Sequence, residues 1–327
     1  MKTLQLSSFG EPTDVVELAE IASGKPGPGQ LAVAIEAATV NPSDLMLISG
    51  VYGVRPELPA ALGAEGIGRV VAVGEGVDAA RIGDRVLVVP TLEQATWRER
   101  TIVDERNAVP VDADGDPLQL AMLGINPITA HSLSRLRKAR ARPLGRPDGS
   151  KLVDGSLRAR SGQACRPAHA QRGATRSVRD VAAGCRRRVV LVEGDDLAKQ
   201  AADAIGDAPL ELIIDGVAGD PVAQLAPLLK TGGQIVSYTA RGRQPLSISI
   251  LDLIFRGRSV HGYWLNLWLQ STPRDTVAQT YRELGTLVAG GTLAAPVEAT
   301  YGLADYRDAI AHAAHNDRNG KVLFALG

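Results

Sequence analysis

Residues Leu210-Glu211-Leu212-Ile213-Ile214 form an apolar run of strand length between two segments with a helical pattern. The alternation continues on both sides, with predicted strands at Val189–Val192 and Gln234–Tyr238 and predicted helices from about Asp196 to Ile205 and from about Pro221 to Leu229. Strands that alternate with helices predict a parallel sheet with crossover helices. The chain is therefore predicted to be an α/β protein, in which the strand at 210–214 needs earlier strands beside it.

The first part of the chain has a different pattern, in which short strands are separated by glycine and proline turns. Strand-like runs cover 31–37, 68–74 and 83–88, and the first of them follows the turn Pro26-Gly27-Pro28-Gly29. This spacing predicts a β-rich domain. Farther on, a helix is predicted over about 276–288, and strand-like pieces at 295–298 and 322–324 are expected to return to the β-rich domain.

Length and composition are typical of a globular protein with two domains. The chain has 327 residues, 45% of them hydrophobic, and a formal net charge of zero. No run approaches the roughly 20 apolar residues that span a bilayer, and the N-terminus lacks a signal-peptide pattern. We therefore expect a cytoplasmic protein with no membrane partner. The two cysteines, Cys165 and Cys185, are too few for a disulfide framework or a structural zinc site.

One window of the chain, residues 132–188, does not have the pattern of a folded domain. It holds 16 of the 36 basic residues, only 3 of the 36 acidic residues, and no Phe, Tyr, Trp, Ile or Met. Neither helical nor strand periodicity persists in it, so no core element is expected there. Read literally, the window is either a basic disordered insertion or an arginine-rich arm that binds nucleic acid. The absence of aromatic stacking partners favours the disordered insertion, with no nucleic acid as partner.

A third reading, which we favour, is that the window is translated out of frame, since a GC-rich gene read in the wrong register yields Arg, Ala, Gly and Pro. When the codons of Arg137 to Val153 are regrouped from each second base, one permitted translation is V-K-L-G-P-G-H-W-V-G-Q-T-A-A-N-S-S. The continuation through Arg179 permits a helix and then L-R-T-L-N-V-V-R-R. Most positions permit several residues, but Asp148 regroups only to Thr or Met and Lys151 only to Asn or Ser. The regrouped window supplies the strand, turn, helix and strand that the sheet lacks.

Several motifs outside the window occur in a fixed order. They are Asn41-Pro42-Ser43-Asp44, Gly50-Val51-Tyr52, Arg55-Pro56-Glu57-Leu58-Pro59, Gly63-Ala64-Glu65-Gly66-Ile67-Gly68, Leu253-Ile254-Phe255-Arg256-Gly257, Gly262-Tyr263-Trp264-Leu265, Ala295-Pro296-Val297-Glu298 and Gly320-Lys321-Val322. As an ordered set they resemble the zinc-independent medium-chain dehydrogenase/reductase superfamily, in particular its 2-enoyl-thioester reductase and quinone oxidoreductase-like branch.

The resemblance implies a division of the chain into domains. A GroES-like catalytic domain is expected over 1–118, a Rossmann-type cofactor-binding domain with a doubly wound parallel sheet over 119–270, and a return to the catalytic domain over 271–327. Residues 133–188 are anomalous, so the first βαβ unit is scrambled in the literal sequence. The resemblance also implies a homodimer formed through the edge of the cofactor sheet.

No metal site is expected. Zinc-dependent relatives have a histidine where this chain has Ala64, and the five histidines do not cluster in the sequence; they are His131, His169, His261, His312 and His315. Oxidation of an alcohol would lack its Lewis acid, so reduction of an activated C=C bond fits better.

The resemblance assigns the catalytic role to Tyr52. Hydride addition to an enoyl thioester creates an enolate that needs a proton at the α-carbon, and a phenol can stabilise the enolate and supply the proton. Without the resemblance, Tyr52 is a tyrosine in a glycine-flanked surface turn. Asn41 either offers amide donors beside this site or initiates a turn with Pro42. Glu65 is expected to accept backbone hydrogen bonds and hold its loop rather than to take part in catalysis.

Other candidate contacts come from separate segments. Trp264 and Trp268 have helical spacing, which is typical of core residues, and the resemblance places them in the wall of an acyl pocket. Asn126 and Thr129 resemble a run that lines the nicotinamide in relatives, or else they start a helix. Lys321 either binds a cofactor phosphate or is a solvated surface lysine.

Cofactor-binding residues are also predicted after two strands, because ligands of open α/β sheets bind at the carboxyl ends of the strands. They are Val217, Gly219, Tyr238, Thr239 and Arg241. In the regrouped frame, the turn T-A-A-N-S-S would receive the pyrophosphate, and the arginines of V-V-R-R favour a 2′-phosphate. The expected cofactor is therefore NADPH.

The expected function is NADPH-dependent reduction of the C=C bond of 2-enoyl thioesters, carried by CoA or by an acyl-carrier protein. An NADPH:quinone or small-enone oxidoreductase has the same fold and cofactor and is the first alternative. If the literal window is real, the chain is instead an inactive remnant or a binding protein that lacks cofactor binding.

Overall fold

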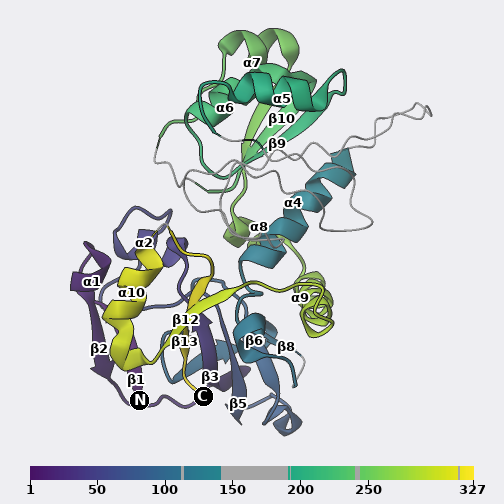
Figure 1. The fold of residues 1–327 in the computed structure, drawn as a ribbon. Coiled ribbons are helices and arrows are strands. Elements are labelled where there is room, and N and C mark those ends of the chain that lie inside the picture. The colour runs from purple at the N-terminus through teal and green to yellow at the C-terminus, as the bar shows by residue number, and fades with distance from the viewer. Residues whose placement is uncertain (112–113, 141–190, 192, 240–243, 316) are drawn as a thin grey trace. The chain divides into compact units, whose positions relative to one another are not determined.

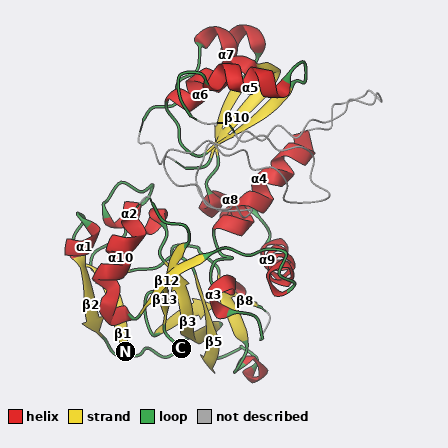
Figure 2. Ribbon diagram, in the orientation of Figure 1, coloured by secondary structure: helices red, strands yellow, loops and turns green. Residues whose placement is uncertain are grey.

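The computed structural model describes residues 1–111, 114–140, 191, 193–239, 244–315 and 317–327. These residues form two compact units, of which one contains Met1–His131 and Leu269–Gly327 and the other contains the described residues between 132 and 268. Figure 1 traces each unit along the chain, and Figure 2 colours them by secondary structure. Most of the predicted strand Val189–Val192, the regrouped window from residue 141 onward, and Arg241 lie outside the described residues.

The first unit is built mainly on antiparallel strands, and of its described strands only the last two pair in parallel. Its large sheet has the order β12-β13-β3-β5-β6-β8, with β7 also paired to β3, and a small sheet has the order β2-β1-β4. The strands are β1 (Lys2–Leu6), β2 (Val16–Glu20), β3 (Gln30–Thr39), β4 (Ala60–Ala61), β5 (Gly66–Val73), β6 (Arg85–Val88), β7 (Arg100–Asp104), β8 (Ala108–Pro110), β12 (Val297–Tyr301) and β13 (Lys321–Ala325). The β-rich domain predicted from the glycine-turned strands is confirmed.

The C-terminal strand completes this unit, as its apolar pattern predicted. β13 pairs antiparallel with β3, with Leu323 opposite Thr39. The ring of Phe324 packs edge-on against Trp97 with 5.3 Å between ring centroids, and the Trp97 indole donates a 2.9 Å hydrogen bond to the carbonyl of Thr39. Both rings are fully buried, so the two ends of the sequence share one core.

Helices cover the sheets of the first unit. They are α1 (Pro12–Val15), α2 (Pro42–Ile48), α3 (Pro117–Leu120), α9 (Arg274–Ala289), α10 (Tyr306–Ala314) and the first turns of α4 (Asn126–Arg140). The buried hydroxyl of Tyr281 in α9 donates a 2.8 Å hydrogen bond to the carbonyl of Gly124. The predicted helix over about 276–288 is therefore confirmed and is held to the segment that precedes α4.

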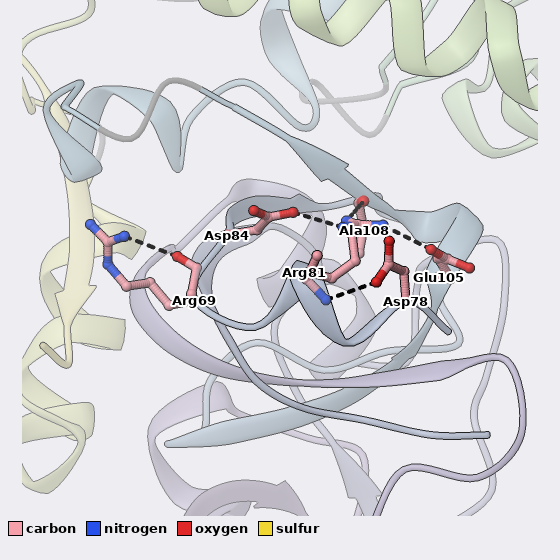
Figure 3. Close-up of polar contacts among 8 residues, drawn as sticks. Arg69, Asp78, Arg81, Asp84, Glu105 and Ala108 are labelled. Carbon is pink, nitrogen blue, oxygen red and sulfur yellow. Dashed lines mark hydrogen bonds and ion pairs between the residues drawn. The ribbon is translucent and has the colours of Figure 1, made fainter. Parts of the chain in front are cut away.

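One arginine ties together several strand connections of the first unit. Arg81, in a short 3₁₀ turn, contacts Asp84 at 2.7 Å and Glu105 at 3.0 Å, and donates a 3.2 Å hydrogen bond to the carbonyl of Ala108 (Figure 3). The Arg81 side chain is mostly buried, so its five donors need such acceptors. These bonds fix the turn before β6 against the start of β8.

The second unit contains a parallel sheet of order β11-β10-β9 among the described residues. Its elements are α5 (Leu197–Ile205), β9 (Leu210–Asp215), α6 (Asp220–Leu225), β10 (Leu229–Ser237), α7 (Ile250–Arg256), β11 (Ser259–Gly262) and α8 (Leu265–Ser271). Apolar residues of α5 and α6, among them Leu197 and Val222, pack with Ile213 and Ile235 of the sheet. The parallel sheet predicted from alternating strands and helices is confirmed.

The segment between α6 and β10 differs from the prediction. The helix expected to reach Leu229 ends at Leu225, and a 3₁₀ turn over Ala226–Leu228 follows. Pro227 explains the change, because it has no N–H for an α-helical hydrogen bond. β10 begins at Leu229 rather than Gln234, and its pairing with β9 is irregular between these two residues. No helix in the described part of the chain is both long and apolar enough to cross a membrane.

Candidate active site

Tyr52 lies four residues beyond the end of α2 at Ile48, and the last turn of this helix holds its backbone in place. Gly50 adopts φ 71°, a left-handed conformation that suits glycine and turns the chain out of the helix. The amides of Val51 and Tyr52 both donate to the carbonyl of Met46, at 3.0 and 3.2 Å. The half-buried Tyr52 therefore lies on a short segment whose backbone is hydrogen-bonded to α2.

Asn41 lies at the other end of α2, and its amide is the centre of a buried polar network. Its Nδ2 donates to Oγ1 of Thr39 and to Oε1 of Glu65, each at 2.8 Å, and its Oδ1 accepts a hydrogen bond from Nζ of Lys321. All four side chains are at most 4% exposed. Since buried polar groups are costly unless paired, this network fixes where α2 begins.

Glu65 joins the network to a second segment. Its Oε1 also accepts a 2.7 Å hydrogen bond from Oγ1 of Thr39, and its Oε2 accepts one of 2.7 Å from the backbone amide of Ile125. Burial raises the pKa of the Glu65 carboxyl, and the charge of Lys321 opposes this rise. The expectation that Glu65 holds its loop by accepting hydrogen bonds is confirmed.

Asp44 adds a second carboxyl beside the same network. It accepts a 2.8 Å hydrogen bond from the backbone amide of Asn41 and so caps the start of α2. Burial raises the pKa of Asp44 to about 7; the nearby charge of Glu65 adds to the rise, and Lys321 acts against it. Two buried carboxyls and one buried ammonium therefore share one polar cluster.

The structure corrects two expectations for this cluster. Lys321 is not a solvated lysine, because it is 4% exposed and its ammonium donates to Asn41. Asn41 does start a helix with Pro42, but both of its amide donors go to Thr39 and Glu65 rather than toward substrate. Lys321 and Asn41 are thus positioned to hold α2.

The second unit brings together four of the predicted cofactor residues at one sheet edge. β9, β10 and β11 are parallel, with Ser237 in register with both Asp215 and Gly262, so the residues that follow them emerge at the same edge. Val217, Gly219, Tyr238 and Thr239 lie just beyond these strand ends, and the amide of Tyr238 donates a 3.1 Å hydrogen bond to the carbonyl of Asp215. Their contacts with a cofactor stay predictions.

The turn after β9 is held by the side chain of Asp215. Oδ1 of Asp215 accepts hydrogen bonds from the amides of Val217 and Ala218, at 2.9 and 2.8 Å. Ala218 and Gly219 then adopt φ values of 65° and 69°. Oδ2 of Asp215 is buried and has no hydrogen-bond partner among the described residues.

The remaining predicted residues lie on helices, except Trp264, which directly precedes α8. Asn126 is the first residue of α4, and the amide of Thr129 donates to the carbonyl of Ile125 at 3.1 Å, so the helix-start reading is confirmed. The amide of Trp268 in α8 donates to the carbonyl of Trp264 at 3.2 Å, which confirms helical spacing, and both indoles are half-buried. Contacts of these four residues with nicotinamide or acyl chain stay predictions.

Across the residues that the structure describes, no three His, Cys, Asp or Glu side chains gather closely enough to hold a metal ion. Sequence reasoning missed two members of the polar cluster, Thr39 and Asp44. The signal for Asp44 is its place three residues after Asn41, the spacing of a capping box. Thr39 has no such signal, since its role arises only from the pairing of β3.

Two family models match the chain. The alcohol dehydrogenase GroES-like domain matches residues 27–113, and the zinc-binding dehydrogenase model matches residues 189–323. The anomalous window 132–188 therefore falls between the two matches. The unmatched stretch is the one in which the literal sequence lacks a βαβ unit.

Proteins similar over nearly the whole chain are mitochondrial enoyl-[acyl-carrier-protein] reductases. The one from Bos taurus is 30% identical, covering 94% of this chain and 83% of its own length, and the one from Homo sapiens is 28% identical, covering 95% and 84%. Similar solved structures include a quinone oxidoreductase from Pseudomonas syringae (TM-score 0.73, 21% identity) and a mutant enoyl thioester reductase from Candida tropicalis (TM-score 0.68, 19% identity), each covering 99% of both chains. Fold, sequence motifs and relatives agree, and the chain belongs to the zinc-independent medium-chain dehydrogenase/reductase superfamily of NAD(P)H-dependent oxidoreductases.

Proposed function

We propose that this protein reduces the C=C bond of 2-enoyl thioesters with NADPH. The observation that carries the proposal is the 30% identity to an enoyl-[acyl-carrier-protein] reductase over 94% of the chain. Tyr52 supports the proposal further. Its backbone is fixed by hydrogen bonds to the last turn of α2, its side chain is half-buried, and its phenol can act as the acid that the reaction requires.

Bound NADPH would supply the hydride for the β-carbon of the enoyl group. Tyr52 would donate a hydrogen bond to the enolate oxygen that forms and then transfer its proton to the α-carbon, after which the phenolate regains a proton from water. Asn41 and Lys321 would act indirectly, by holding the start of the helix that carries Tyr52.

The finer points of the proposal are the cofactor, the acyl pocket and the assembly. Residues proposed to hold the nucleotide are Asn126, Thr129, Val217, Gly219, Tyr238, Thr239 and, outside the described residues, Arg241. Preference for NADPH over NADH rests on the arginines of the regrouped window. Trp264 and Trp268 would contact the acyl chain, the carrier would be CoA or an acyl-carrier protein, and a homodimer is proposed. The cytoplasmic location stays a prediction.

Steady-state assays with purified protein test the proposal. We expect NADPH oxidation with crotonyl-CoA to exceed that with a soluble quinone, and Tyr52→Phe to lower kcat by roughly 10²- to 10⁴-fold because the general acid is lost. Tyr301→Phe is the matched control, since the Tyr301 hydroxyl contacts His312 and lies outside the polar cluster. Faster turnover of the quinone would favour a quinone oxidoreductase, and unchanged turnover by Tyr52→Phe would remove the tyrosine from the mechanism. If neither crotonyl-CoA nor the quinone supports NADPH oxidation, the protein is an inactive remnant.

A further inference from the structure

A cavity of about 430 Å³ opens on the first unit, apart from the polar cluster. Its lining comes from Met1 and the segment after β2, from β3, β4 and β7, and from Pro56, the loop at 92–95 and Arg98. The charged side chains that line it are Arg98, Arg100 and Glu93. Two guanidinium groups and one carboxylate therefore line a volume large enough for part of a small molecule.

Arg98 is the most unusual group in this cavity. It is half-buried, its Nε is fully buried, and its side chain has no hydrogen bond or ion pair within the described parts of the chain. Loss of hydration lowers the pKa of this guanidinium. A buried arginine normally has an acceptor, because an unpaired buried cation is costly. The two terminal nitrogens are not among the fully buried atoms, so they are the groups of Arg98 that can donate to an anion in the cavity.

The loop that contributes Leu92 and Glu93 to the lining has a strained backbone. Leu92 has φ 69°, and only Ala218 shares this left-handed conformation among the non-glycine residues that the structure describes. Such strain is found at ligand clamps and switch regions. The side chain of Thr91 donates a 2.6 Å hydrogen bond to Gln94, and Thr91 also contacts Glu93, so the loop is closed on itself beside the cavity.

The cavity also lies near the proposed acid along the chain. Pro56 lines it and is four residues from Tyr52, so their Cα atoms are at most about 15 Å apart. CoA and the prosthetic group of an acyl-carrier protein share a phosphopantetheine arm, which places an anionic phosphate at a distance from the thioester. Arginine is suited to such groups, because its planar fork of donors matches phosphate oxygens.

We propose that this cavity, through Arg98 and Arg100, binds the phosphate of the phosphopantetheine arm that carries the enoyl thioester. The inference rests on the proposed function for the identity of the carrier. The charge balance agrees with it, because two guanidinium groups against one exposed carboxylate leave a positive charge for the phosphate.

Direct binding tests this site without requiring catalysis. Calorimetric titration would compare 4′-phosphopantetheine with pantetheine, which differ by one phosphate, and CoA and inorganic phosphate would serve as further probes. We expect 4′-phosphopantetheine to bind at least about tenfold more tightly than pantetheine, and Arg98→Gln to abolish this difference. Arg106→Gln is the matched control, since Arg106 is an exposed arginine outside the cavity and should leave the preference unchanged.

The outcomes separate this site from the reductase function. Equal binding of the two ligands, or a preference that persists in Arg98→Gln, would overturn the proposal even if the protein reduces enoyl thioesters. Inorganic phosphate that binds as tightly as 4′-phosphopantetheine would overturn the carrier as the occupant. Tight CoA binding in Arg98→Gln together with weak 4′-phosphopantetheine binding would assign CoA to a nucleotide site instead. Thermal unfolding without ligand provides a folding check: Arg98→Gln should not lower Tm, because the lost group is an unpaired cation.

Discussion

Lys321, the first residue of β13, donates a hydrogen bond from its buried ammonium to Oδ1 of Asn41, the residue that precedes α2. The two residues are 280 positions apart in the sequence. The backbone of Tyr52 is hydrogen-bonded to the other end of α2, so the contact between β13 and Asn41 helps to position the proposed acid. The same kind of contact holds the strands of the first unit together and the turn after β9 in place.

Replacing Lys321 should destabilise the first unit. Lys321→Met leaves Oδ1 of Asn41 without its donor and removes the positive charge that offsets the buried Glu65 carboxyl. We expect a loss of about 3 kcal/mol in the free energy of unfolding, measured by urea denaturation. Lys230→Met is the control, because Lys230 forms an exposed ion pair with Glu211 and should cost less than about 1 kcal/mol. Equal losses in the two variants would show that burial of Lys321 carries no stability.

The Asp44 carboxyl should make stability fall as pH rises. Its pKa is raised from 3.8 to about 7 in the folded state, so the folded protein binds the proton more tightly than the unfolded chain between these values. Ionisation of the carboxyl therefore does not lower the free energy of unfolding below about pH 4, and it lowers it by about 4 kcal/mol at pH 7. Asp44→Asn retains an acceptor for the Asn41 amide and should abolish this dependence.

Urea denaturation of both proteins between pH 4 and pH 8 measures this effect. The advantage of Asp44→Asn over the parent should be near zero at pH 4 and largest at pH 8. A constant difference over this range would mean that Asp44 titrates normally. Glu65→Gln serves as a second series, because the Glu65 carboxyl also has a raised pKa and lies in the same cluster.

Gly68 should not tolerate a side chain. A Cβ at this position would lie 2.1 Å from the carbonyl oxygen of Ala34, in the middle of the β3-β5 pair. Gly68→Ala must therefore displace backbone, and we expect a loss of at least about 3 kcal/mol or a failure to fold. Gly53→Ala meets nothing within 4 Å and should change stability by less than about 1 kcal/mol. Equal Tm values for Gly68→Ala and Gly53→Ala would contradict the close approach of β3 and β5.

Asp215 should stabilise the turn that follows β9. Asp215→Ala removes the acceptor of the Val217 and Ala218 amides, so two backbone donors lose their partner. We expect a loss of about 2 kcal/mol in unfolding experiments, whereas Asp215→Asn, which keeps Oδ1, should lose less. Asp207→Ala, at an exposed position before β9, is the control and should be neutral. Similar stability of Asp215→Ala and Asp207→Ala would mean that the turn is held by other contacts.

Elements with strong local patterns were predictable from the sequence. The run 210–214 became β9, and the strand-like pieces near the C-terminus became β12 and β13 with shifted ends. Their apolar periodicity is a property of neighbouring residues, so no tertiary information is needed to detect it. The end of α6 was misjudged because an apolar run suggested a longer helix, while Pro227 stops it.

The candidate site was predictable only in part. Tyr52, Asn41 and Glu65 were found through the order of their motifs, and the loop-holding role of Glu65 followed from its glycine-rich setting. The burial of Lys321 was not predictable, because a lysine side chain is ordinarily solvated. Arg98 drew no attention either, since the loss of hydration that makes it unusual depends on the walls of the cavity.

The sequence by itself determined the alternation of strands and helices, the glycine-turned β-rich domain and the superfamily, because each depends on residues close together in the chain or on motifs in fixed order. The tertiary structure alone decided which charges are buried and what they contact. The pairing of β13 with β3 brings Lys321 to Asn41, and the Arg98 side chain that lines the 430 Å³ cavity has no partner among the residues that the structure describes. Burial and pairing arise only when distant segments exclude water from one another, and the energies of these charged groups follow from that exclusion.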